Sequence, residues 1–177
     1  MDRRKWVTNP RQAAFLLTDE DEVLYGGAVG GGKTDALLIS CLMKAKAHAG
    51  SQSLFLRRTF ADLQLPDAIM ARAKAWLIGR PGVSWNGDTK TFTFECAPTK
   101  DHPKGGKSTL TFGYMDSELD KYRYQSAMFQ FIESEGVDGA LVAGDALEDD
   151  VTAAVESLDT AEHFQPETQL GFLAGKA

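Results

Sequence analysis

Residues 27–34 read Gly-Ala-Val-Gly-Gly-Gly-Lys-Thr, which fits the pattern G-x-x-x-x-G-K-[ST] of a phosphate-binding loop. In such a loop backbone N–H groups surround the phosphates, the lysine reaches the β- and γ-phosphates, and the threonine hydroxyl helps to hold Mg²⁺. A glycine-rich turn that binds nothing is the alternative, but such a turn does not require four glycines followed by Lys-Thr. The candidate binding residues are therefore Gly27, Gly30, Gly31, Gly32, Lys33 and Thr34.

The residues around this loop predict a strand that enters it and a helix that leaves it, at residues 22–25 and 34–49. A helix in that place directs free N–H groups and the positive end of its dipole at a phosphate. Residues 53–58 predict a second strand, and the T-x-x-D spacing that begins at Thr59 predicts the start of another helix. This alternation predicts an α/β fold with three layers and a mainly parallel sheet.

The hydrophobic period changes at residue 83, beyond the helix that is predicted to follow the second strand. Apolar residues alternate with polar ones in residues 83–96 and 110–114, and Asn86-Gly87 is a turn signal, so we expect an added segment of antiparallel strands. The connecting residues 97–107 form a basic loop, which either contacts nucleic acid backbone or is simply solvated. Its candidate DNA contacts are Lys100, Lys104 and Lys107.

Charge divides the chain into two segments. The 177 residues carry a net charge of −6, but residues 1–132 hold 18 basic and 14 acidic side chains, whereas residues 133–177 hold 1 and 11. We therefore expect a folded domain over residues 1–132 and an acidic, poorly packed tail over residues 133–177. The sequence has no apolar run long enough for a membrane span and no signal peptide at its start, which predicts a cytosolic protein without a membrane partner.

Three polar residues outside the loop are further candidates. Gln12 lies in a predicted helix at residues 10–17, and its amide has the donor and acceptor needed to read an adenine edge. A solvated helix residue is the alternative. Arg57 and Arg58 emerge at the carboxyl end of the second strand, where they either contact a phosphate or DNA or form a solvated pair.

In combination, these features resemble the ATPase domain of phage large terminase subunits, which are DNA-packaging motors. The resemblance runs in order from about Asn9 to Ile132 and includes the loop, Gln12, the strand that ends in Arg-Thr-Phe, and Tyr124-Gln125 ahead of residues 129–132. It implies a P-loop NTPase fold, incomplete at its C-terminus, that hydrolyses ATP with Mg²⁺ to move double-stranded DNA into a prohead. It also implies a phage or prophage gene, the bacterial cytoplasm, a homo-oligomeric motor, and a terminase small subunit and portal as partners.

The resemblance also implies roles for single residues. Gln12 would read adenine, Lys33 would act on the phosphates and Thr34 would hold Mg²⁺. Hydrolysis in this family further needs an aspartate and then a glutamate after the strand at residues 129–132. Here Glu135 falls on the aspartate position as a second metal ligand, and Gly136 falls on the glutamate position. Glu133 and Glu135 are therefore the candidate catalytic carboxylates.

Two departures from the family leave alternatives open. The loop has no arginine, so an arginine that stabilises the transition state must be Arg57, Arg58 or one from a neighbouring subunit. The chain becomes strongly acidic from Glu133 onward. The nuclease of a full-length terminase is expected to be absent. The alternatives to a working motor domain are a nucleotide-binding remnant that does not hydrolyse ATP and another P-loop ATPase or nucleotide kinase.

Overall fold

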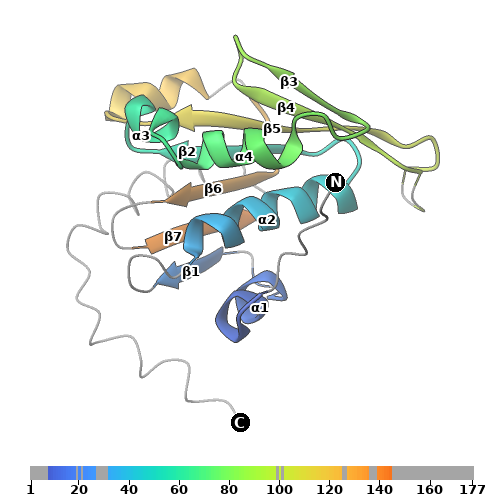
Figure 1. Ribbon diagram of the computed structural model, residues 1–177, viewed down its shortest axis with the longest axis horizontal. Helices are drawn as coiled ribbons and strands as arrows, with labels where there is room; N and C mark the ends of the chain where they lie inside the picture. The colour runs from blue at the N-terminus through green and yellow to red at the C-terminus, as the bar shows by residue number, and fades with distance from the viewer. Residues whose placement is uncertain are drawn as a thin grey trace.

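The computed structural model describes residues 8–18, 20, 22–26, 32–98, 100, 102–124, 127–135 and 139–144. Twelve helices and strands follow one another along these residues (Figure 1). In chain order they are α1 (Pro10–Leu16), β1 (Glu22–Gly26), α2 (Lys33–Ala47), β2 (Gln52–Arg57), α3 (Phe60–Gln64), α4 (Ile69–Leu77), β3 (Val83–Asn86), β4 (Thr91–Cys96), β5 (Gly106–Tyr114), the 3-10 helix η1 (Glu118–Arg123), β6 (Phe131–Glu135) and β7 (Gly139–Gly144).

The strands form one seven-stranded sheet with the order β1-β7-β6-β2-β5-β4-β3. Strand β2 pairs in parallel with β5 on one side and with β6 on the other. Strand β7 is antiparallel to both of its neighbours, β1 and β6, so β1 runs in the same direction as β6, β2 and β5. The carboxyl ends of these four strands therefore meet at one edge of the sheet, and α2 begins at that edge (Figure 1).

The α/β class is confirmed, but the expectation of a mainly parallel sheet is wrong. The described strands make two parallel and four antiparallel pairings. Two of the antiparallel pairings come from the expected segment β3-β4-β5. The other two arise because β7, from residues expected in the tail, lies between β1 and β6. The boundary expected at residue 132 accordingly falls inside β6, and residues 145–177 lie outside the described residues.

The helices cover one face of the sheet. Phe55 and Phe112 point from the central strands into the main apolar core, which they share with residues of α1, α2, α3 and α4. Leu54, Leu56 and Ile132 point to the opposite face and pack against a smaller cluster that includes Phe129 and Tyr124. Strand β2 is therefore buried on both faces, which explains its nearly continuous apolar run. The third layer that the sequence predicts is not formed by α-helices in the described residues, because all four pack on the same face.

Local sequence explains the start of the first helix. Pro10 occupies the first turn of α1, and Asn9 and Gln12 form a reciprocal capping box, in which each side chain bonds the other residue's backbone N–H group. The ring of Phe15 stacks on Tyr25 of β1, with centroids 4.8 Å apart, and fixes α1 beside the first strand. Among the helices that the structure describes, none combines the length and the apolar character needed to cross a membrane.

Candidate functional site

The candidate site lies at the N-terminus of α2, at the edge where β1, β6, β2 and β5 end. The first helical residue is Lys33, and Gly32 caps the helix with φ +74°, a left-handed conformation that favours glycine. The next residue, Thr34, lies in the first helical turn. The preceding loop residues 27–31 lie outside the described residues, so the predictions for Gly27, Gly30 and Gly31 are not placed.

A hydrogen bond joins this helix to the end of β6. The hydroxyl of Thr34 donates to Oε1 of Glu135, the last residue of the strand. Glu135 is 7% exposed, so its carboxylate lies within the protein rather than in bulk solvent. The structure therefore brings together the two residues that the sequence proposes as metal ligands.

Arg57 approaches the same carboxylate from the neighbouring strand. It is the last residue of β2, and the parallel register that pairs Leu56 with Ser134 places Arg57 beside Glu135. Its Nη2 atom lies 3.1 Å from Oε2 of Glu135 as an ion pair, but without the alignment of a hydrogen bond. Oε2 and the Arg57 Nε atom are thus buried without a hydrogen-bond partner among the described residues.

The residues present fit a hard divalent cation. Mg²⁺ takes oxygen ligands and is usually held in proteins by one or two carboxylates together with substrate phosphates. The Thr34 hydroxyl and the Glu135 carboxylate supply oxygen donors at one point, and Oε2 retains unused acceptor capacity. The described residues contain no group of three or more His, Cys, Asp or Glu side chains of the kind that forms an all-protein metal site.

Glu133, the other candidate carboxylate, has different surroundings. It is fully buried, its Oε2 accepts a hydrogen bond from the Cys41 thiol at 2.9 Å, and its Oε1 lies 3.5 Å from Nζ of Lys44. Cys41 is seven residues beyond Thr34 on α2, which is about 10 Å along the helix axis. Burial raises the pKa of the Glu133 carboxyl, although Lys44 and the Cys41 thiol oppose the shift. Burial, and then the charge of Glu133, raise the pKa of the Cys41 thiol well above its usual value.

Gln12 reaches the site from α1. Its Nε2 atom donates to the backbone carbonyl of Gly32 at 3.0 Å, and its Oε1 atom accepts from the N–H of Asn9 at 2.9 Å. The amide that the resemblance assigns to adenine therefore contacts the residue directly before Lys33. The N-x-x-Q spacing of a capping box was the signal in the sequence for the contact with Asn9.

The remaining basic candidates are divided between the two edges of the sheet. Arg58 is exposed and follows β2, at the same edge as Thr34. The exposed side chains of Lys100, Lys104 and Lys107 lie where β4 leads into β5, at the amino end of β5. Because β5 has nine residues, this end is about 25 Å from the carboxyl edge. The structure does not bring the basic loop and the α2 N-terminus together.

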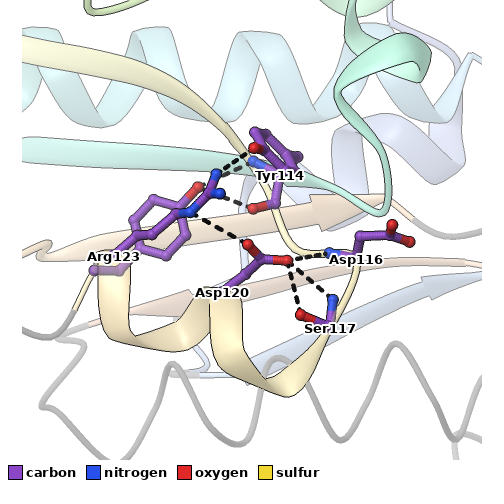
Figure 2. A network of polar contacts seen from close by, with 6 residues as sticks. Tyr114, Asp116, Ser117, Asp120 and Arg123 are labelled. Atoms are coloured by element: carbon purple, nitrogen blue, oxygen red, sulfur yellow. Dashed lines mark hydrogen bonds and ion pairs between the residues drawn. The ribbon is translucent and has the colours of Figure 1, made fainter.

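A polar network at the carboxyl end of β5 was not recognised from the sequence (Figure 2). Oδ2 of Asp120 accepts from the backbone N–H groups of Asp116 at 3.1 Å and Ser117 at 3.0 Å, and Oδ1 lies 3.2 Å from Nε of Arg123. Arg123 also donates to the hydroxyl of Tyr114, the last residue of β5. The network holds η1 against the edge at which Arg57 and Glu135 lie. In the sequence, the acidic residues of this segment were the local pattern that could have indicated it.

Comparison of this chain with protein-family models, with curated proteins and with solved structures finds no significant match.

Proposed function

We propose that this chain binds a nucleoside triphosphate, taken to be ATP, together with Mg²⁺ at the N-terminus of α2. The observation that carries the proposal is the hydrogen bond between Thr34 and Glu135. It joins the threonine of the phosphate-loop pattern to a carboxylate at the end of a parallel strand, directly beside Lys33. A hydroxyl and a carboxylate in this arrangement are the protein ligands that hold Mg²⁺ in P-loop NTPases.

The residues of the site have separate tasks in this proposal. Lys33 contacts the β- and γ-phosphates, and the free N–H groups at the start of α2 bind phosphate oxygens. Thr34 and Glu135 hold the metal ion, which when bound neutralises charge on the phosphates. Arg57 keeps the Glu135 carboxylate at the end of β6 through their ion pair.

We propose further that the nucleotide site belongs to the ATPase domain of a terminase-type DNA-packaging motor. The order of motifs in the sequence supports this role, and the three exposed lysines of the basic loop are suited to contact DNA phosphates. In that role ATP hydrolysis would be coupled to movement of double-stranded DNA into a prohead. The motor would be a homo-oligomer in the bacterial cytoplasm, with a terminase small subunit and a portal as partners.

One observation favours a second candidate, a domain that binds the nucleotide but does not hydrolyse it. Glu133 is buried against Cys41 and Lys44, and Glu135 is engaged by Thr34 and Arg57. In this candidate Glu133 serves the packing of α2 against β6 and Glu135 serves the metal ion, so neither carboxylate has the task of activating an attacking water. The position that the resemblance assigns to the catalytic glutamate is Gly136, which lies outside the described residues.

The test measures binding of ATP with Mg²⁺ by calorimetry and release of phosphate, with and without double-stranded DNA. Lys33→Ala is expected to weaken binding roughly tenfold or more, because a hydrogen bond to a charged group is lost. The matched control, Lys46→Ala, removes the same charge from an exposed position near the far end of α2, and it is expected to leave binding unchanged. Equal affinity of the Lys33→Ala variant and the unmodified chain would refute the site. Binding without phosphate release would favour the second candidate.

A further inference from the structure

Gln12 connects α1 to the residue that caps α2. Its amide bridges two backbone groups that are 23 positions apart, the N–H of Asn9 and the carbonyl of Gly32. The first partner is a donor and the second is an acceptor, so together they determine which end of the amide faces each of them. Gln12 is also 5% exposed. Both polar ends of this side chain are therefore engaged within the protein.

Gly32 can accept this contact because it has no side chain. Its φ of +74° is strained for any other residue, and a Cβ atom at this position would lie 2.5 Å from Nε2 of Gln12. The absence of a side chain thus lets the Gln12 amide reach the Gly32 carbonyl. Because α1 is itself fixed to β1 by the stacking of Phe15 on Tyr25, the contact joins the start of α2 to the sheet.

From this geometry we propose that Gln12 is a positioning residue for the N-terminus of α2 and not a reader of the nucleotide base. It holds the Gly32 carbonyl and so orients the adjacent Lys33 and Thr34 toward a polyphosphate. This inference rests on the proposed nucleotide site and specifies its chemistry. Gln12 therefore contributes to the affinity for the triphosphate group, and this contribution is the same whatever base the triphosphate carries.

The test compares the affinities of the Mg²⁺ complexes of ATP, GTP and inorganic tripolyphosphate, measured by calorimetry. Gln12→Ala is expected to weaken all three by the same factor, roughly twofold to tenfold, which corresponds to the loss of one hydrogen bond. Gln12→Glu retains the acceptor for Asn9 but replaces the donor to Gly32, so it is expected to weaken all three at least as much. Loss of ATP affinity with unchanged affinity for GTP and tripolyphosphate would overturn the inference, because that pattern identifies a base reader.

A control separates positioning of α2 from stability of α1. Asn9→Ala removes the side chain that accepts from the N–H of Gln12 and weakens the cap of α1, but it keeps the bond from Gln12 to Gly32. This variant is expected to lower the melting temperature while it leaves the three affinities close to those of the unmodified chain. If Asn9→Ala weakens binding as much as Gln12→Ala, the effect belongs to α1 as a whole and the inference fails.

A second measurement does not depend on any ligand. Limited trypsin digestion, followed by mass spectrometry, reports cleavage after Lys33. The inference expects faster cleavage there in Gln12→Ala than in Asn9→Ala, because only the first variant removes the bond from the Gln12 amide to the Gly32 carbonyl and leaves that carbonyl with the N–H of Ala36 alone. Equal rates would overturn the inference. If the unmodified chain binds none of the three ligands, the proposed function fails, and the cleavage rates still decide whether Gln12 positions α2.

Discussion

The hydroxyl of Thr34 donates a hydrogen bond to the carboxylate of Glu135, although 101 positions separate the two residues in the chain. Glu135 ends a strand, Thr34 lies in the first turn of a helix, and Arg57 pairs with the same carboxylate from the next strand. Three elements therefore converge on one buried acidic group. Removal of either partner leaves a buried oxygen of Glu135 with one contact fewer, so the site contributes to stability as well as to the proposed binding.

Thr34→Val is expected to reduce both stability and metal-dependent binding. Valine has a similar shape but no hydroxyl, so Oε1 of Glu135 loses its donor, at a cost of about 1–3 kcal/mol in the free energy of unfolding. Urea unfolding measures this cost, and nucleotide binding in Mg²⁺ and in EDTA measures the metal-dependent part of the affinity. Thr34→Ser keeps the hydroxyl and is the control. If Thr34→Val bound the Mg²⁺ nucleotide as tightly as Thr34→Ser, the hydroxyl would have no part in metal binding.

Gly32→Ala is expected to destabilise the protein more than Gly79→Ala. Both glycines have positive φ, +74° and +83°, and a left-handed conformation costs a residue with a Cβ about 1–2 kcal/mol. At Gly79 an added Cβ meets nothing within 4 Å, whereas at Gly32 it meets the Gln12 amide. Chemical denaturation measures the difference. In a Gln12→Ala background the excess cost at Gly32 is expected to disappear, and an excess that persisted would have to come from another contact.

Glu133→Gln is expected to stabilise the protein at pH values above the range in which a glutamate usually titrates. The folded-state pKa of Glu133 is raised by burial, so folding favours the protonated form, and stability falls as pH rises from the unfolded-state pKa through the folded-state pKa. The neutral amide does not ionise and removes this loss. Thermal unfolding of both proteins at pH 4 and at pH 8 measures the gain in stability from the substitution, and the gain is expected to be larger at pH 8. A gain that was the same at both pH values would show that ionisation of Glu133 does not carry the effect.

Lys104→Gln is expected to weaken binding of double-stranded DNA and to reduce its salt dependence. Each phosphate contact by a basic side chain contributes about 0.9 to the slope of log affinity against log salt concentration, so the loss of one contact lowers the slope by about that amount. Arg11→Gln is the control, because Arg11 is also exposed but lies on α1, away from the basic loop. Fluorescence anisotropy at several salt concentrations measures both variants. Equal slopes for the two variants would exclude a contact by Lys104.

Several features of the fold were predicted correctly because their signals are local. The phosphate-loop pattern predicted a helix that begins at its last residues, and α2 begins at Lys33. The alternation of apolar residues and the Asn86-Gly87 turn predicted the antiparallel strands β3, β4 and β5. These structures are determined by residues that are close together in the chain, so a local sequence pattern is enough to predict them.

Only the tertiary structure decided which distant groups meet. The sequence placed carboxylates at positions 133 and 135, but the pairing of β6 with β2 and the packing of α2 turned Glu135 to Thr34 and buried Glu133 beside Cys41. The insertion of β7 between β1 and β6, and the engagement of the Gln12 amide by Gly32, were likewise settled by contacts between distant segments. A strand pattern states that a strand forms but not which strand it joins, because pairing depends on the burial and hydrogen bonding of the whole sheet.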